Sequence, residues 1–103
     1  MSDLQERAAN WHRQRFPDAD QYHVALKSME ELGEVAEALN SEAGRKSATA
    51  TAGDVVAEAA DVIICMLVLV GRWRVADLLD AVDRKLVTLE TAGAHRASLL
   101  EVP

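Results

Sequence analysis

Apolar residues recur every three or four positions along most of the chain, which is the period of an amphipathic α-helix. The pattern predicts four helices, over residues 3–15, 21–42, 53–72 and 75–90. Phe16-Pro17 ends the first helix, and Asp20 is a suitable N-cap for the second. The alternation typical of β-strands does not occur in the sequence. We therefore expect an all-α fold, a bundle-like arrangement with a four-helix core.

The apolar stripes of these helices predict which faces pack together. They comprise Leu4, Ala8 and Trp11 in the first helix, Leu26, Met29, Leu32, Val35, Ala36 and Leu39 in the second, and Val75, Leu78, Leu79, Val82, Leu86 and Leu89 in the fourth. The third helix is apolar on nearly all sides, as is typical of a buried helix. Since a chain of 103 residues forms only a small core by itself, we expect a homodimer or homotetramer that associates through apolar faces of the third and fourth helices.

The chain length and the net charge limit the classes of protein to which this chain can belong. A chain of 103 residues predicts one domain, with its core over about 3–91 and a loose C-terminal tail. The formal net charge of −6 disfavours binding to the phosphate backbone of a nucleic acid polymer. A single nucleotide is still compatible with this charge, because a bound cation inverts the local electric field.

The sequence also predicts the cellular compartment. Cys65 is the only cysteine, which excludes an intrachain disulfide and fits a reducing compartment. The first six residues have neither the basic start nor the apolar segment of a signal peptide. The longest hydrophobic stretch, residues 55–70, contains Glu58 and Asp61 and is too short to span a bilayer. We expect a cytoplasmic protein that does not enter a membrane.

Polar side chains interrupt the apolar third helix along one narrow arc, which contains Asp54, Glu58, Asp61, Cys65 and Arg72. Asp54 is best explained as an acid at the start of a helix, where it suits the helix dipole. Glu58 and Asp61 lie deeper in the apolar run, and a buried carboxylate without a cationic partner costs several kcal/mol. Mg²⁺, which prefers oxygen ligands, is the natural partner for such a pair.

The second helix carries a matching acidic stripe. Glu31 and Glu34 share a face with Lys27, because residues three or four apart lie together on a helix. Such a stripe alone is usually the solvated side of an amphipathic helix. Opposite the Glu-x-x-Asp of an antiparallel third helix, however, it would place four carboxylates together, and with one or two Mg²⁺ ions they would form a site for a triphosphate.

The arrangement Glu30-Glu31-x-x-Glu34, a gap of 23 residues, and Glu58-x-x-Asp61 resembles the signature of the MazG-type all-α NTP pyrophosphatases. The resemblance covers roughly residues 4–90. It implies that Glu31, Glu34, Glu58 and Asp61 bind Mg²⁺, for which Mn²⁺ can substitute. It also implies a catalytic function for Glu30, either with a second metal ion or in orienting the attacking water. The implied reaction is hydrolysis of a nucleoside triphosphate to the monophosphate and pyrophosphate.

Several residues are candidates for substrate binding. Lys27 is placed either to contact a phosphate or to pair with Glu31. Lys85 interrupts the edge of the apolar face of the fourth helix, where a phosphate contact is favoured over a snorkelling side chain. Trp11 is a candidate for stacking on the base, although packing in the core is favoured. A solvated loop is favoured for Arg45 and Lys46, and the three histidines (His12, His23 and His95) show no ligand spacing.

Three alternatives to this function share parts of the pattern. Phosphoribosyl-ATP pyrophosphohydrolase is similar in size and in its acidic motifs, but that family has a Tyr-His pair where this chain has Ile64-Cys65. A di-iron bundle needs Glu-x-x-His pairs, which neither acidic motif contains. A non-catalytic helical dimerisation module stays open. The base and sugar of the nucleotide also stay open, because the pattern does not define the shape of the pocket.

Overall fold

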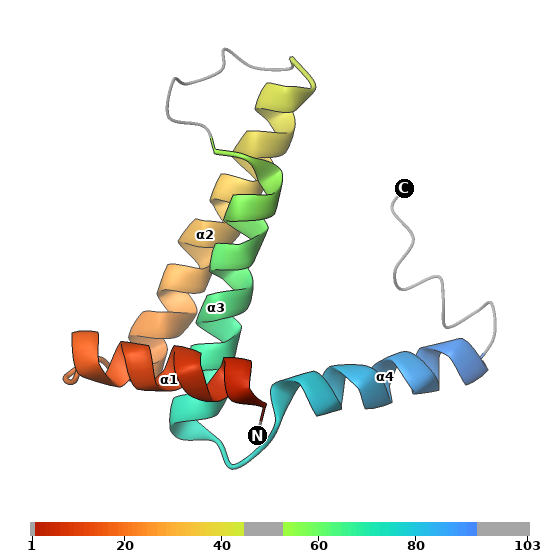
Figure 1. Cartoon of the computed structure of the whole chain (residues 1–103). Coiled ribbons are helices and arrows are strands. Elements are labelled where there is room, and N and C mark those ends of the chain that lie inside the picture. The colour runs from red at the N-terminus through yellow and green to blue at the C-terminus, as the bar shows by residue number, and fades with distance from the viewer. Residues whose placement is uncertain (1, 45–52, 93–103) are drawn as a thin grey trace.

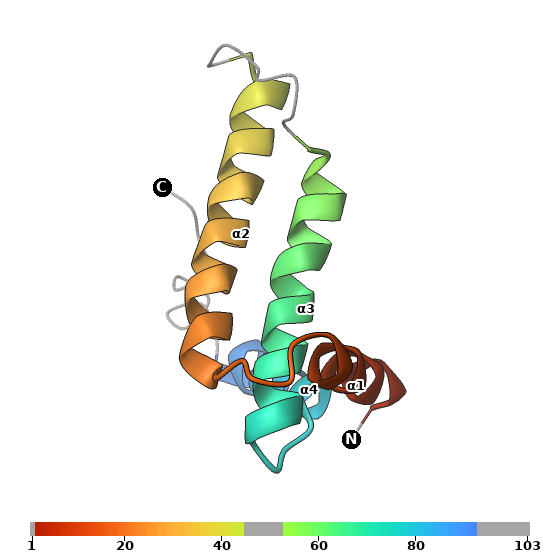
Figure 2. The same ribbon diagram turned by 90° about the vertical axis from the view of Figure 1, so that its left-hand side faces the viewer.

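A computed structural model describes residues 2–44 and 53–92 of the chain. Over these residues it contains four helices and no strand, so the predicted all-α class is confirmed. The helices are α1 (Asp3–Arg15), α2 (Gln21–Glu42), α3 (Val55–Trp73) and α4 (Leu78–Ala92). Helices α2 and α3 run side by side, α1 lies across the end at which α3 finishes, and α4 points away from the other three (Figures 1 and 2).

Short polar side chains cap the first three helices. Ser2 Oγ accepts a hydrogen bond from the Gln5 backbone N–H, and Asp20 does the same for His23. Helices α1 and α2 therefore begin and end where the sequence predicted. Helix α4 begins three residues later than predicted, at Leu78, and Asp77 is the reason: its carboxylate accepts a hydrogen bond from the Asp80 N–H at 3.1 Å, which is a capping contact that the apolar pattern does not reveal.

Helix α1 packs on α3 through small and polar residues. Ala9 and Gln5 are buried, and a Cβ atom added to Gly71 would lie 2.9 Å from the Cβ of Ala9. The absence of a side chain at Gly71 thus allows the two backbones to approach closely. The predicted stripe was wrong by one position, since Leu4 is 50% and Trp11 53% exposed. Gln5 lies on the face that contacts α3 because its side chain makes hydrogen bonds to the connection between α3 and α4.

Helix α2 packs on α3 through its acidic side. Its buried residues, Val24, Glu31 and Ala38, are spaced by seven and so occupy one line along the helix. Most of the predicted apolar stripe is exposed, including Leu26, Met29, Leu32 and Leu39, whereas Val35 is half-buried. The prediction of the packing face was therefore wrong for α2, because the acidic cluster described below, and not the apolar stripe, lies against α3.

The predicted four-helix core is not formed within a single chain. In α3 only Leu67, Val68 and Gly71 are buried, so the burial expected for this apolar helix is not reached within one chain. No residue of α4 is buried, and its apolar side chains Leu79, Val82, Leu86 and Val87 are exposed. The core is thus formed by α1, α2 and α3. Within the described residues, no helix is both long enough and apolar enough to cross a membrane.

Some predictions fall outside the described residues. Arg45 and Lys46 lie in the segment 45–52, and His95 and the C-terminal tail lie in 93–103. The predictions made for these residues stay predictions.

Candidate metal centre

Four carboxylates converge between α2 and α3. Glu31 and Glu34 come from α2, and Glu58 and Asp61 come from α3. Each residue offers one oxygen, and these four oxygens all lie within 4.8 Å of one another. The spacing of three residues within each pair directs both carboxylates of a helix to the same face. The predicted convergence of these four residues is confirmed, and the cluster could hold a metal ion.

The cluster is partly removed from water and lacks internal compensation for its charge. Glu31 is only 7% exposed, and Oε2 of Glu58 is buried without a hydrogen-bond partner among the described residues. A hydrogen bond to Glu58, followed by desolvation and by the charge of Glu58, raises the pKa of Glu34. Carboxylates this close repel one another unless a proton or a cation lies between them. The orphaned oxygen of Glu58 fits a site for a cation.

Gly53 makes room for one of these carboxylates. A Cβ atom at this position would overlap Oε1 of Glu58, so any side chain here would displace the carboxyl group. From the sequence, Gly53 is expected only to mark the start of the third helix. Its position directly before Asp54, which caps α3 by accepting a hydrogen bond from Val56 N–H at 2.9 Å, was the only signal available. The interpretation of Asp54 as an acid at the helix start is confirmed.

Lys27 provides positive charge at the edge of the cluster. Its Nζ lies 3.2 Å from Glu31 Oε1 and 3.5 Å from Glu30 Oε2. The hydrogen bond to Glu31 and the charges of both glutamates raise the pKa of Lys27, so it is protonated. Of the two alternatives left open for Lys27, the ion pair with Glu31 is present, and the contact with a phosphate stays a prediction. Glu30 lies outside the group of four carboxylates, with its side chain 68% exposed and in contact with Lys27.

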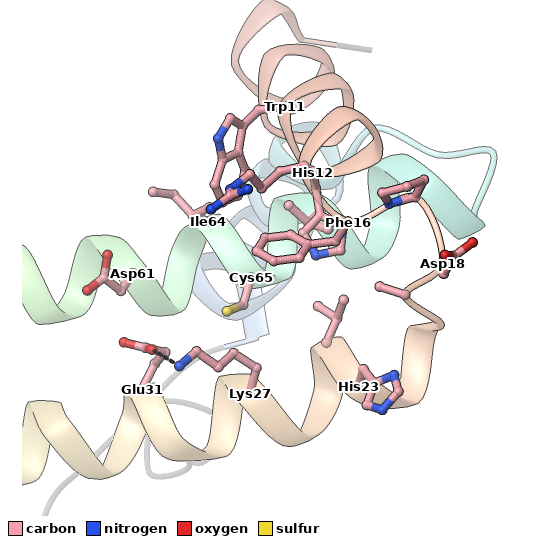
Figure 3. A pocket seen from close by; sticks show the side chains of 15 residues that line it. Trp11, His12, Phe16, Asp18, His23, Lys27, Glu31, Asp61, Ile64 and Cys65 are labelled. Carbon is pink, nitrogen blue, oxygen red and sulfur yellow. Dashed lines mark ion pairs between the residues drawn. The ribbon is translucent and has the colours of Figure 1, made fainter.

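A pocket of about 900 Å³ opens beside the cluster (Figure 3). Lys27, Glu31 and Asp61 line it on one side, and rings from the end of α1 line it on the other. Trp11 belongs to this second side, where its ring meets that of Phe16 edge-on at 6.0 Å. The expectation that Trp11 packs in the core was therefore wrong, because the indole faces the pocket and stays half exposed.

Neither His12 nor Arg72 was predicted to contribute to this site. His12 lines the pocket, and its Nδ1 lies 2.8 Å from Nη1 of Arg72. The same guanidinium donates to the Phe16 carbonyl oxygen at 3.0 Å, which fixes the end of α1 against α3. Neither residue belongs to a recognisable motif, and the contact joins positions 60 apart in the chain. Phe16 was interpreted only as a helix terminator.

Two further candidates contribute nothing to the cluster within one chain. Lys85 is an exposed residue of α4, and the described lining of the pocket comes from α1, the turn after it, α2 and α3. Cys65 lines the pocket as a half-buried thiol. Burial, followed by the charge of Glu31, raises the pKa of Cys65, so the thiol is protonated and unreactive.

No family model, no curated protein and no solved structure matches this chain. The resemblance of its acidic motifs to one family therefore stays a prediction.

Proposed function

We propose that the protein is a Mg²⁺-dependent pyrophosphohydrolase, similar to the MazG-type enzymes, that converts nucleoside triphosphates to the monophosphate and pyrophosphate. One observation carries the proposal: four carboxylate oxygens from the two acidic motifs lie within 4.8 Å of one another beside a large pocket. Carboxylate clusters of this kind bind Mg²⁺ in enzymes that act on phosphates.

Glu31, Glu34, Glu58 and Asp61 would hold the metal ion. Their donors are all carboxylate oxygens, which suit Mg²⁺, and the buried, unpartnered Oε2 of Glu58 fits a missing cation. When bound, Mg²⁺ neutralises phosphate charge and activates water for attack on phosphorus. Mn²⁺ accepts the same ligands and is expected to substitute.

Lys27 and Glu30 act at the edge of this site. The Lys27 ammonium lies beside Glu31 and lines the pocket, so it is placed to contact a phosphate oxygen of a bound nucleotide. The exposed Glu30, in contact with Lys27, takes one of the two functions that the family resemblance implies: it binds a second metal ion or orients the attacking water.

The aromatic side of the pocket suits the base of a nucleotide. Trp11 and Phe16 present ring surfaces on which a base can stack, and Ile64 and Val68 add apolar surface. A volume of about 900 Å³ is within the range of small-molecule sites, which is about 300 to 1,000 Å³. A triphosphate directed towards the carboxylates and a base directed towards Trp11 would use both sides of the pocket.

A homodimer or homotetramer in the cytoplasm is part of the proposal. The exposed apolar side chains of α3 and of α4, such as Ile63 and Leu86, form surfaces that a second copy would cover, and those of α2 add to them. Lys85, which lies on α4, would then contribute to the site of the partner copy.

The experiment is calorimetric titration of the metal-free protein with Mg²⁺ and Mn²⁺. Wild type should bind either ion, and Glu58→Gln and Asp61→Asn should each lose most of that binding while remaining helical. Asp83→Asn is the matched control, since it removes one exposed carboxylate from α4, outside the cluster. Absence of metal binding in the wild type would contradict the proposal and favour a non-catalytic dimerisation module.

A further inference from the structure

The imidazole of His12 is part of the aromatic side of the pocket. Its ring centroid lies 5.2 Å from that of Phe16 and 6.0 Å from that of Trp11. Figure 3 shows His12 beside these two rings, across the pocket from Lys27 and Glu31. Of these three rings, only imidazole combines a donor and an acceptor of hydrogen bonds. The protonation state of its two nitrogens therefore decides what this wall offers a ligand.

Arg72 determines that protonation state. A guanidinium has only donors, so the 2.8 Å contact between Arg72 Nη1 and His12 Nδ1 requires Nδ1 to accept. The neutral ring then carries its hydrogen on Nε2. Arg72 is itself held in place by the Phe16 carbonyl oxygen at 3.0 Å and by the Trp73 ring at 4.6 Å. Burial, followed by the charge of Arg72, lowers the pKa of His12, so the ring is neutral at neutral pH.

The Nε2–H group is left for a ligand. Within the described residues, Arg72 is the hydrogen-bond partner of the His12 ring, and it occupies Nδ1. The Arg15 side chain, 5.6 Å from the Phe16 ring, also lines this wall, and the Nε2–H donor between aromatic rings suits a flat ligand that carries an acceptor at its edge. The phosphates of a nucleotide are expected at the other side, near Lys27 and the carboxylates, so the group facing His12 is the base.

We propose that His12 determines base specificity by donating a hydrogen bond from Nε2 to a carbonyl oxygen or ring nitrogen of the base. Arg72 is a positioning residue that fixes the tautomer and acts only through His12. This inference rests on the proposed function. A base that presents a donor at this point would leave two N–H groups facing each other without acceptors, and it would be rejected.

The tautomer is tested by ¹⁵N NMR of the imidazole groups, with His12→Phe identifying the signals of His12. In the wild type, His12 should show the Nε2–H form and a pKa below that of an ordinary histidine. Arg72→Met should give a mixture of tautomers and a higher pKa of His12, whereas Arg72→Lys, which retains a donor, should restore much of the wild-type pattern. An Nδ1–H form in the wild type would overturn the inference.

The specificity is tested with a panel of deoxynucleoside triphosphates and Mg²⁺. His12→Phe keeps an aromatic ring and removes the donor. It should raise KM for the preferred nucleotide by about two- to tenfold, leave kcat within about twofold, and reduce the differences between bases. His12→Gln, whose amide nitrogen lies near the position of Nε2, should recover most of the selectivity.

The outcomes of these experiments distinguish the inference about His12 from the proposed function. Active wild type with unchanged KM and base preference in His12→Phe overturns the inference and leaves the proposed function standing. A wild type that hydrolyses no nucleotide, despite the expected NMR pattern, overturns the proposed function and this inference with it. Mg²⁺ affinity, measured without nucleotide, should be the same in His12→Phe as in the wild type.

Discussion

Gln5 of α1 accepts a hydrogen bond from the backbone N–H of Leu78, the first residue of α4, at a distance of 2.7 Å. Its amide nitrogen donates to the Ala76 carbonyl oxygen at 2.9 Å. Gln5 is fully buried. One side chain thus satisfies two backbone groups of the connection between α3 and α4, and it fixes the point at which α4 leaves the other helices.

Replacement of this glutamine should destabilise the protein. Gln5→Leu is similar in size but leaves the Leu78 N–H and the Ala76 carbonyl without their partner, which should lower the free energy of unfolding by about 1 to 3 kcal/mol. Gln14→Leu, at an exposed position of the same helix, should change it by less than about 0.5 kcal/mol. Urea denaturation measures both. Equal stability of Gln5→Leu and the wild type would show that water replaces these contacts.

Gly53 should matter for metal binding although it has no ligand atom. Gly53→Ala introduces a Cβ atom that overlaps Oε1 of Glu58, so the carboxyl group must move away from the cluster. We expect Mg²⁺ affinity to fall by about tenfold, as is common when a residue that supports a ligand is changed. Gly33→Ala is the matched control, because a Cβ atom there meets nothing within 4 Å. It should gain about 0.5 to 1 kcal/mol of stability and keep its affinity. Similar affinities in the two variants would place the Glu58 carboxylate elsewhere.

The pH dependence of the metal-free protein should reflect Glu34. Its pKa is raised above the ordinary 4.5, so the folded state holds a proton that the unfolded state releases. This contribution to stability is fully present below pH 4.5 and is lost as the pH rises through the raised pKa of the folded state. Because protons compete with metal, stabilisation by Mg²⁺ should increase with pH over the same interval.

Melting temperatures between pH 4.5 and 7.5, with EDTA and with Mg²⁺, measure this effect. His12 acts in the opposite direction, since its lowered pKa removes stability as the pH falls below 6.5. Comparison with Glu34→Gln isolates the contribution of the glutamate, because the variant should lack the change of melting temperature with pH that Glu34 causes. Identical pH profiles would contradict a proton shared with Glu58.

Lys85 should act on the substrate of another copy of the chain. Lys85→Met keeps the apolar stem and removes the charge, so stability and Mg²⁺ binding without nucleotide should be unchanged. Loss of a phosphate contact, worth about 1.5 to 3 kcal/mol, should lower kcat/KM by roughly ten- to a hundredfold. Arg84→Met, which removes a neighbouring charge paired with Asp80 at 3.0 Å, is the control and should retain its kinetics.

The prediction for Lys85 requires that the chain forms an oligomer, which can be measured separately. Sedimentation at micromolar concentration should show a dimer or tetramer. Co-assembly of Lys85→Met with Glu58→Gln, each weakly active or inactive alone, should restore activity, because one site in the mixed oligomer receives an intact acidic cluster and the lysine of its partner. A stable monomer, or no recovery in the mixture, would mean that Lys85 does not reach the site.

Features that depend on residues close together in the sequence were easier to predict than contacts between distant positions. The approximate positions of the helices and the acidic pair on each of them were predictable because both follow from local spacing, as with Glu31 and Glu34 three residues apart, although α3 begins two and α4 three residues later than predicted. The packing faces were not, since the contacts are made by Ala9, Ala38 and Gly71, whose small side chains leave little trace in a hydrophobic pattern. Contacts such as His12 with Arg72 join positions 60 apart and have no local signal.

The measurement that tests the central claim most directly is product analysis by ³¹P NMR after incubation of nucleoside triphosphates with the protein and Mg²⁺. The proposed function predicts nucleoside monophosphate and pyrophosphate in equal amounts, with turnover abolished by EDTA and by Glu31→Gln, Glu58→Gln or Asp61→Asn. Formation of diphosphate and inorganic phosphate, or near wild-type turnover in any two of the three variants, would contradict a reaction carried out at these four carboxylates.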